Sequence, residues 1–410
     1  MTQKVVVYPI NDVRSQFPAL SRTYHDQPVA YFDGPGGSQV ISSSIKAISN
    51  YMERGGANLH GAFPSSWETE AIIVDAKKAV ADFLVVDPKE VAFGANMTTL
   101  TLAISRALAK TWNPGDEIVV TEMDHRANVD PWLVIAEERG VKVRWIPINK
   151  QTLTLDTSNL NKIINDKTRL VAVGYASNAI GTIVDVETVS KRAKEVSALV
   201  AVDAVHAAPH IAIDRDQLGA DILLCSAYKF FGPHIGIAAI KKKLLESLVP
   251  YKLVPAPDYI PDKFETGTQN HEGIAGIQPA IEFYASLGEG RTRREKIING
   301  YHAIESHENR LATKIREALA KIDKVSLTHA GPSVAKTPTI AFRVEGYTPQ
   351  QVCEYLAEKH AIFVACGHFY ASTIGDVLGV NPDGGWIRAG LAPYNSDGEV
   401  DRFIYALQQL

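Results

Sequence analysis

The clearest chemical signal in this 410-residue chain comes from an acid and a lysine that end two apolar segments. Asp203 ends the run Leu199–Asp203, and Lys229 follows the next apolar run in the segment Ser-Ala-Tyr-Lys. A carboxylate beside a pyridine nitrogen keeps that nitrogen protonated, so the ring can accept electrons from a carbanion, and a lysine amine can form a Schiff base. Taken singly, Asp203 could cap a helix and Lys229 could be a solvated loop residue. Together they indicate a cofactor with a pyridine ring, held where two strands end.

A second signal is a place where a helix could bind an anion. In the segment 94–100, Gly-Ala-Asn-Met-Thr-Thr-Leu, a short strand ends and a helix begins. Backbone amides near Met97 and Thr98 would then point at an anion with the helix dipole behind them. A threonine that only caps the helix is the simpler alternative. The pattern suits the phosphate group of a cofactor.

Sequence periodicity predicts the elements that must position these groups. Between about residues 75 and 240, helical stretches such as 75–86 alternate with short apolar runs. This alternation predicts crossover units and a mainly parallel α/β sheet covered by helices, with ligands at the carboxyl ends of the strands. The expected strands are 117–121, 141–146, 170–173, 199–202 and 221–224.

After Gln278 the pattern changes, which indicates a second, smaller α/β unit. A long charged helix is expected at 293–322, followed by strands near 339–344 and 362–365 and by a closing helix at the C-terminus. The proline-rich segment 250–262 reads as a surface loop.

Composition and charge argue against several classes of protein. The chain is 46% hydrophobic with a formal net charge of -4, so it can bury a large core but has no basic stripe for nucleic acid or an anionic membrane. The sequence shows neither a secretory leader nor a membrane-spanning run, so we expect a cytoplasmic protein. Cys225, Cys353 and Cys366 are too few and too scattered for a disulfide framework or a zinc site, and no metal is expected.

Two motifs carry a family resemblance. Val-Asp-Ala-Val-His at 202–206 and Ser-Ala-Tyr-Lys at 226–229 resemble the cofactor signatures of the class V aminotransferases, and the nearest likeness is to cysteine desulfurases of the group II type. The resemblance runs from about Tyr31 to the C-terminus, with its motifs in the family's order. It implies pyridoxal 5'-phosphate as the cofactor and a fold-type-I homodimer with active sites at the subunit interface.

We expect three parts in such a chain. Residues 1–30 would form an N-terminal arm that contributes to the small domain, residues 31–290 the large cofactor-binding domain, and residues 291–410 the small C-terminal domain.

The resemblance implies a role for each matching residue. Lys229 would form the Schiff base and shuttle protons, Asp203 would contact the ring nitrogen, and His125 would lie flat on the ring. The phosphate would be held by Thr98, Ser226 and, from the partner subunit, Thr268, together with the Met97 amide at the start of the helix, although Met97 itself departs from the family pattern. His206 and Asn178 would border the ring hydroxyl. Arg388, together with Asn178, would bind the carboxylate of an amino-acid substrate.

One loop departs from the desulfurase pattern. Desulfurases take sulfur onto a mobile cysteine in a loop that reads approximately Arg-Thr-Gly-His-His-Cys-Ala, whereas residues 365–371 here read Ala-Cys-Gly-His-Phe-Tyr-Ala. Tyr370 therefore stands at the persulfide-forming position, and Cys366 lies four residues earlier. Gly61 stands where many group II enzymes have arginine, and Tyr228 replaces the histidine beside the lysine. Ordinary persulfide transfer is therefore not expected.

The retained residues predict removal of a substrate α-proton by Lys229 from an external aldimine. The favoured outcome is β-elimination at a carbon-sulfur bond, a C-S lyase reaction, with Tyr370 or His368 protonating the leaving group. A true desulfurase that uses Cys366, an aminotransferase or an amino-acid epimerase stays open as an alternative. A non-catalytic cofactor-binding module is disfavoured, because binding alone would not require Arg388.

Overall fold

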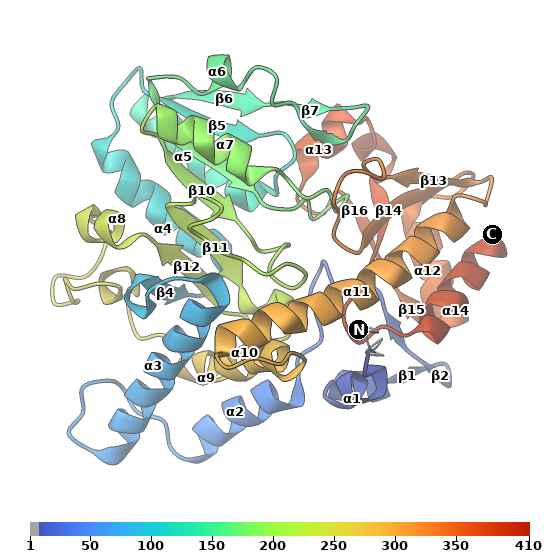
Figure 1. Cartoon of the computed structure of the whole chain (residues 1–410), viewed down its shortest axis with the longest axis horizontal. Coiled ribbons are helices and arrows are strands. Elements are labelled where there is room, and N and C mark those ends of the chain that lie inside the picture. The colour runs from blue at the N-terminus through green and yellow to red at the C-terminus, as the bar shows by residue number, and fades with distance from the viewer. Residues whose placement is uncertain (1–7) are drawn as a thin grey trace, which may run out of the picture.

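The computed structural model describes residues 8–410, and a seven-stranded sheet forms its centre (Figure 1). Six of the strands run parallel, and only β12 is antiparallel to its two neighbours, β11 and β4. The expected mainly parallel sheet is therefore confirmed. In spatial order the strands are β4 (Val91–Gly94), β12 (Gly236–Ile240), β11 (Ile222–Ser226), β10 (Leu199–Asp203), β9 (Thr168–Gly174), β5 (Glu117–Thr121) and β6 (Lys142–Ile146).

Helices cover both faces of this sheet, which is why its strands are apolar throughout. Successive strand residues point to opposite faces, so Ile118 and Val120 of β5 pack in one hydrophobic cluster while Val119 packs in the other. The first face is covered by α4 (Met97–Leu108), α5 (Asp130–Arg139) and α8 (Lys242–Ser247). The second is covered by α3 (Pro64–Leu84), α7 (Val186–Glu195) and α10 (Ile277–Ser286).

A second, four-stranded antiparallel sheet has its own core beside the large sheet (Figure 1). Its order is β13 (Val325–Thr328), β14 (Thr339–Val344), β17 (Trp386–Gly390) and β16 (Ala365–Gly367). The helices α12 (Pro349–His360) and α14 (Asp397–Gln408) pack on it.

Helix α11 (Arg293–Leu319) connects the two cores. Its first half places Ile297 and Ile304 in the core of the large sheet, and its second half places Leu311 and Ile315 in the core of the small one. A capping box between Thr292 and Glu295 fixes where the helix begins. One rigid element therefore holds the two sheets relative to each other.

Several boundaries differ from the sequence expectations. Helix α3 begins at Pro64 instead of residue 75, because Pro64 occupies a first-turn position where a missing N–H is tolerated. The expected strand 362–365 is two strands in different sheets: β15 (Ile362–Phe363) pairs with β3 (Ala30–Tyr31), whereas β16 pairs with β17. Segment 250–261 is a loop, as expected, with Val254 fully exposed.

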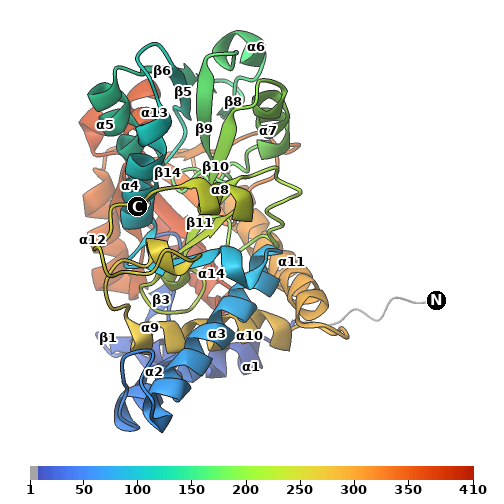
Figure 2. The same cartoon turned by 90° about the vertical axis from the view of Figure 1, so that its left-hand side faces the viewer.

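The remaining elements lie at the periphery. Helix α2 (Ser42–Glu53) and the short α9 (His271–Ala275) lie together below the large sheet in two perpendicular views (Figures 1 and 2). The first described helix, α1 (Ile10–Ser15), is tied to the C-terminal region, since Arg14 donates to the Tyr394 carbonyl and to Glu399. The division into an arm, a large domain and a small domain stays a prediction.

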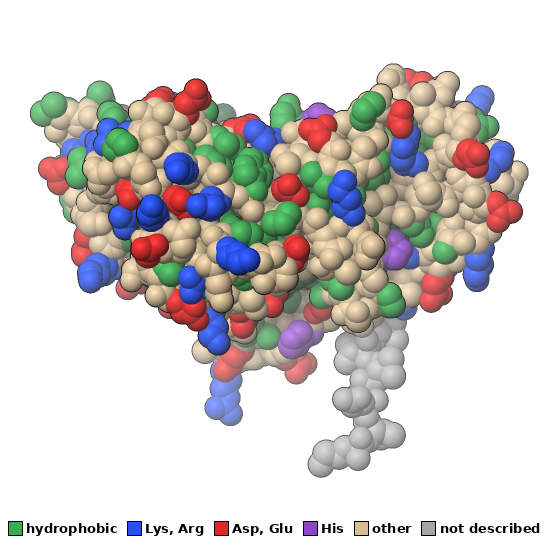
Figure 3. Space-filling model, turned by 90° about the horizontal axis from the view of Figure 1, so that it is seen from above, with side chains coloured by type: hydrophobic (Ala, Val, Ile, Leu, Met, Phe, Trp, Pro, Cys, Tyr) green, Lys and Arg blue, Asp and Glu red, His purple; other side chains and the backbone are tan. Residues whose placement is uncertain are grey.

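Charged side chains of both signs cover one face of the molecule (Figure 3). On the face in Figure 3, acidic and basic side chains are interspersed, and hydrophobic side chains gather near its middle. Among the described residues, no helix combines the length and apolar character needed to cross a membrane.

Candidate active site

A cavity of about 1170 Å³ lies where the carboxyl ends of the large sheet's strands face the small sheet. Strands β5, β9, β10 and β11 each end at this edge, and the loops that follow them supply its walls. The cavity brings together all but one of the residues predicted from the sequence: Met97, Thr98, His125, Asn178, Asp203, His206, Ser226, Lys229, Tyr370 and Arg388. Thr268 is the exception.

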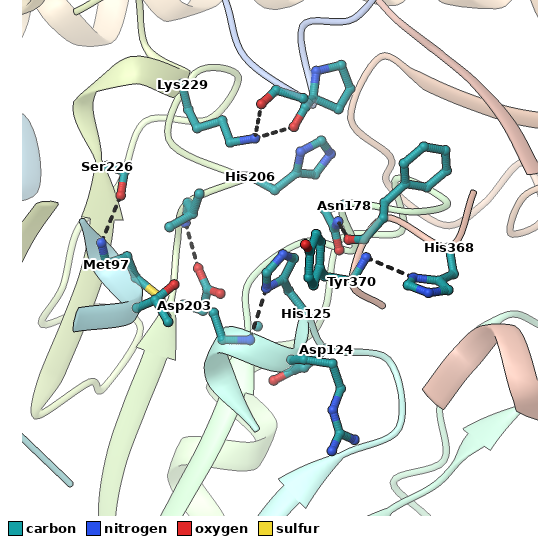
Figure 4. A pocket seen from close by; sticks show the side chains of 18 of the residues that line it. Met97, Asp124, His125, Asn178, Asp203, His206, Ser226, Lys229, His368 and Tyr370 are labelled. Atoms are coloured by element: carbon teal, nitrogen blue, oxygen red, sulfur yellow. Dashed lines mark hydrogen bonds between the residues drawn. The ribbon is translucent and has the colours of Figure 1, made fainter. Parts of the chain in front are cut away.

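Asp203 forms part of the cavity floor at the end of β10 (Figure 4). Its Oδ1 accepts a hydrogen bond of 2.9 Å from the Val205 amide. Protein atoms surround the carboxyl group, and this burial, with the nearby Asp124 carboxylate as a smaller cause, raises the pKa of Asp203 to about 7. A cationic group placed beside it would restore its ionisation.

Lys229 extends into the same space from the turn that follows β11 (Figure 4). Its Nζ donates to the carbonyl oxygens of Pro35 and Gly36, the latter at 2.9 Å, and lies 4.8 Å from the centre of the Tyr228 ring. Burial, followed by the positive charge of Arg388, lowers the pKa of Lys229 to about 7. A lysine with this pKa holds a large fraction of neutral, nucleophilic amine at neutral pH.

The first turn of α4 forms the predicted anion-binding end of the cavity. The Met97 amide donates to the Ser226 hydroxyl at 3.1 Å, so it is engaged by Ser226 instead of pointing freely at an anion as expected. Asn96 caps the helix through the Thr99 amide. β12 passes so close that a Cβ on Gly236 would collide with the backbone of Asn96. Thr98 and Ser226 remain on the cavity wall.

His125 lies in the loop after β5, directly before the short 3-10 helix Arg126–Asn128, and is neutral in this environment. Its Nδ1 accepts a hydrogen bond of 3.0 Å from the Ala127 amide, so the ring proton resides on Nε2. Burial, and then the positive charge of Lys229, lowers the pKa of His125 to about 4. The imidazole lies 5.6 Å from the Tyr370 ring, with 32° between the planes.

Four buried polar atoms of residues that line the cavity lack a hydrogen-bond partner among residues 8–410. Two are Asn381 Oδ1 and Arg388 Nε, and the other two, Nδ1 of His206 and Oδ1 of Asn178, form a pair of a donor or acceptor ring nitrogen and an amide oxygen. The other ends of these side chains are fixed. His206 Nε2 lies 3.1 Å from the hydroxyls of Thr337 and Thr339, and Asn178 Nδ2 donates to the Phe369 carbonyl at 2.8 Å. Unpartnered buried polar atoms carry a free-energy penalty, so this pair marks a place where a polar ligand atom fits.

Arg388 of β17 reaches the cavity from the small sheet and is almost fully buried. Its Nη1 donates to the Asn178 carbonyl at 2.9 Å, and its Nη2 donates to Asp33 Oδ1 at 3.3 Å. The Phe369 ring centre lies 3.8 Å from the guanidinium carbon. A buried guanidinium with donors still available can bind a carboxylate in a bidentate manner.

Thr268 lies outside the cavity of its own chain. It is an exposed residue of the loop after Asp262–Phe264, and the left-handed Gly267 precedes it. It therefore cannot contribute to this cavity, and its predicted contact requires a second subunit.

The loop 365–371 forms the cavity wall on the side of the small sheet. Tyr370 is 70% exposed, and its carbonyl accepts a hydrogen bond of 2.8 Å from the Arg126 amide. Cys366 is opposite Ile387 in the β16–β17 register, and Ile387 belongs to the core of the small sheet. Opposed residues of antiparallel strands point to the same face, so Cys366 lies on the face of the sheet that carries Ile387, where it is exposed at the sheet edge, and Arg388 lies on the opposite face.

The sequence reasoning missed three residues of the site: Asp33, Asp124 and Phe369. Asp33 opens the segment Asp-Gly-Pro-Gly-Gly, whose glycines and proline signal a tight turn, and this turn also supplies both carbonyls that contact Lys229. Asp124 is buried, accepts from Thr121 Oγ1 at 2.7 Å, and has its pKa raised by burial to about 6. No sequence signal pointed to Phe369.

These side chains match the groups of the expected cofactor. One cavity is lined by a carboxyl group, a nucleophilic lysine, a neutral imidazole, a helix N-terminus with a serine hydroxyl, and the unpartnered polar atoms of His206 and Asn178. Each of the first four corresponds to a different part of a phosphorylated pyridine aldehyde: its ring nitrogen, its aldehyde carbon, its ring face and its phosphate.

Comparisons with known proteins agree with this arrangement. The family model described as Aminotransferase class-V matches residues 30–403. The chain is 32% identical to the "Aminotransferase-like protein FGM3" of Gibberella zeae, with 98% of both chains covered. It is 30% identical to a cysteine desulfurase of Pectobacterium carotovorum, again with 98% of both chains covered.

Solved structures show the same fold. The apo structure of a cysteine desulfurase from Thermococcus onnurineus NA1 is similar with a TM-score of 0.88 at 28% identity, and the cysteine desulfurase CsdA of Escherichia coli with a TM-score of 0.84 at 28% identity. Both comparisons cover 98% of each chain. They confirm the predicted fold type.

Proposed function

Because the chain belongs to the class V aminotransferase family, we propose that it binds pyridoxal 5'-phosphate on Lys229 and acts on a small amino acid. One observation carries this proposal. Lys229 and Asp203 follow neighbouring parallel strands, β11 and β10, and enter one cavity with the pKa of the lysine lowered and that of the carboxyl group raised to about 7. Perturbed groups of this kind in one cleft are typical of catalytic sites.

Each part of the cofactor has a partner in the cavity. Lys229 would hold the aldehyde carbon, Asp203 the ring nitrogen, and His125 the face of the ring. Ser226 and Thr98 would hold the phosphate, and the unpartnered atoms of His206 and Asn178 would receive the ring hydroxyl. When bound, the cofactor supplies a protonated ring that accepts electron density from the substrate α-carbon.

The chain's own groups then bind the substrate and move its proton. Arg388 fixes the substrate carboxylate and thereby sets which bond of the α-carbon faces the lysine. The Lys229 amine, once free, accepts the α-proton, since its pKa near 7 suits proton transfer at neutral pH. His125 stays neutral because its pKa lies near 4, so it adds no positive charge above the ring.

The most favoured reaction is β-elimination at a carbon-sulfur bond. With cysteine and water it would give pyruvate, ammonia and hydrogen sulfide, and it needs no sulfur-accepting cysteine. The structural support is that Tyr370 occupies the wall position beside His125, while the Cys366 side chain shares the face of Ile387. Tyr370 or His368 would protonate the departing sulfur.

A second candidate is sulfur transfer by a cysteine desulfurase that uses Cys366. It is favoured by the similarity to proteins named cysteine desulfurase and by the exposure of Cys366 at the cavity wall. An aminotransferase or an epimerase would use the same cofactor and the same proton transfer to Lys229.

We also propose that the chain acts as a homodimer. The second subunit would then cover Thr268 and exposed apolar residues of the loop 250–261 such as Tyr251, Leu253 and Val254. This arrangement would bring Thr268 of the partner subunit to the phosphate. The cytoplasmic location expected from the sequence stays a prediction.

The reaction is tested by supplying the purified protein with cysteine, cystine and a panel of L- and D-amino acids. Pyruvate, sulfide, persulfide and alanine are measured while the visible spectrum is followed. Pyruvate with sulfide or persulfide supports the lyase. Alanine with a persulfide trapped on Cys366 supports the desulfurase instead, and a spectral change without either product indicates transamination or epimerisation.

A further inference from the structure

Phe369 makes a contact with the carboxylate-binding arginine that the function proposed above does not use. Its ring centre lies 3.8 Å from the guanidinium carbon of Arg388. A guanidinium stacked on an aromatic face is attracted by the ring quadrupole and is fixed in its plane, more strongly when both groups are removed from water. Arg388 is only 3% exposed, so this contact is largely desolvated.

The backbone of Phe369 is held in a conformation that it would not adopt without support. Phe369 and Tyr370 have φ angles of 54° and 57°, in the left-handed region that side chains with a Cβ rarely occupy. Such residues persist where surrounding contacts fix them. Here the Asn178 side chain donates to the Phe369 carbonyl and the Arg126 amide donates to the Tyr370 carbonyl, each at 2.8 Å.

The hydrogen bonds of Arg388 leave some of its guanidinium N–H donors without a partner. Nη1 donates to the Asn178 carbonyl, and Nη2 donates to Asp33 at the long distance of 3.3 Å. Nε is buried and has no hydrogen-bond partner among the described residues. A carboxylate that binds in the plane therefore meets the Nε and Nη2 donors, with the Phe369 ring covering one face of that plane.

We infer that Phe369 is a positioning residue for the substrate carboxylate: it holds the plane of Arg388 and thereby fixes the direction of the Nε and Nη2 donors. The loop 367–371 is then a fixed wall of the substrate site and not a swinging arm. This inference rests on the proposed function, because it takes Arg388 as the group that binds the carboxylate of an amino-acid substrate.

The test compares two ligands that differ only in the carboxylate, L-alanine and ethylamine. Both can react with the bound cofactor through their amines, so the shift of its visible band gives a dissociation constant for each. The variants are Phe369→Leu, which keeps an apolar side chain without a π face, Phe369→Ala, and Phe369→Tyr, which restores the ring. Melting temperature and cofactor content show that each variant is folded and loaded.

We expect Phe369→Leu and Phe369→Ala to weaken L-alanine binding by roughly 3- to 30-fold and to leave ethylamine binding unchanged. Phe369→Tyr should bind both ligands as the wild type does. Equal weakening of both ligands, no weakening of either, or failure of tyrosine to restore binding would overturn the inference.

Failure of the cofactor assignment would be visible separately, as a wild-type protein that shows no cofactor band at all. Carboxylate binding by Arg388 is then tested on the apoprotein by calorimetry with propionate, and the variants are expected to show the same order of affinity. Unchanged propionate affinity in Phe369→Leu would again overturn the inference.

Discussion

The amide of Met97, the first residue of α4, donates a 3.1 Å hydrogen bond to the hydroxyl of Ser226, the last residue of β11. This bond joins the predicted anion-binding helix to the strand that leads to Lys229. The helix proposed to bind the phosphate and the strand that leads to the proposed Schiff-base lysine are thus joined directly by a hydrogen bond.

Replacing Ser226 by alanine should therefore weaken phosphate binding specifically. We expect the dissociation constant of pyridoxal 5'-phosphate to rise roughly tenfold, because a hydrogen bond to a charged group is lost, while that of pyridoxal, which lacks the phosphate, stays the same. Absorbance titration of the apoprotein measures both. Ser190→Ala, which removes a buried hydroxyl of α7 far from the cavity, is the control. Equal weakening for pyridoxal would refute the phosphate assignment.

Asp203 should make the stability of the apoprotein depend on pH. Its pKa is raised from 3.8 to about 7, so the folded apoprotein binds the proton more tightly than the unfolded chain does. The raised pKa therefore leaves the free energy of unfolding unchanged below pH 3.8. It lowers the free energy of unfolding progressively as the pH rises from 3.8 toward 7. Apo Asp203→Asn should melt at a higher temperature than the apo wild type at pH 8, with a smaller difference at pH 5.

The loaded protein should show the opposite order. The protonated ring nitrogen would offset the ionised carboxylate in the wild type, and asparagine cannot provide that charge. Calorimetry of apo and loaded forms at both pH values checks this. An Asp203→Asn variant that is destabilised equally in both forms would show that the residue is only structural.

His125 should remain neutral across the working range of pH. Burial lowers its pKa from 6.5 to about 4, so the folded protein favours the neutral ring and loses stability only as the pH falls from about 6.5 toward 4. NMR of protein with labelled histidine, assigned with His125→Gln, should show a ring signal that is constant between pH 5.5 and 8. In denaturant the same ring should titrate near 6.5. A midpoint above 6 in the folded protein would contradict this electrostatic description of the site.

Asp33 should disfavour substrates with an acidic side chain. Its carboxylate lies 3.3 Å from Arg388 Nη2, so a second negative charge close to the clamp would be repelled. We expect Asp33→Asn to improve binding of L-aspartate relative to L-alanine about fivefold, which corresponds to about 1 kcal/mol. The ratio of the two dissociation constants is the readout, because it cancels any general loss of affinity. An unchanged ratio would show that Asp33 does not contribute to the substrate specificity of the site.

The fate of sulfur should separate the two main candidate reactions. If Tyr370 protonates a departing sulfur, Tyr370→Phe should slow sulfide and pyruvate formation while Cys366→Ser should leave both rates close to those of the wild type. Formation of alanine that is lost in Cys366→Ser, with normal cofactor content, would favour the desulfurase. Cys225→Ser is no useful control because that thiol is fully buried in the core of the large sheet.

The sequence was informative where local pattern determines position. Asp203 and Lys229 follow apolar runs, and the parallel sheet brings the ends of such runs to one edge, so their meeting in one cavity could be predicted. Helix α3 was predicted too short, because its first turns contain few apolar residues in a helical pattern.

Contacts between distant segments could not be predicted in this way. The stacking of Phe369 on Arg388 depends on a left-handed backbone that no glycine or asparagine announces at these positions. The pairing of Asp33 with Arg388 depends on a bridge between Asp33 and Gly390, which are far apart in the sequence. Thr268 needs a second subunit, so one chain gives no geometry for it.

The assignment of Lys229 as the residue that holds the cofactor is tested most directly by chemical reduction. The loaded protein is reduced with borohydride, digested, and analysed by mass spectrometry. We expect a pyridoxyl-phosphate group on Lys229 alone, and a Lys229→Ala protein that has neither this adduct nor the visible band. Lys77 and Lys263 are internal controls, because they are also buried but are engaged by Glu265 and by backbone carbonyls. A label on either of these lysines, or a visible band that survives in Lys229→Ala, would show that Lys229 is not the residue that holds the cofactor.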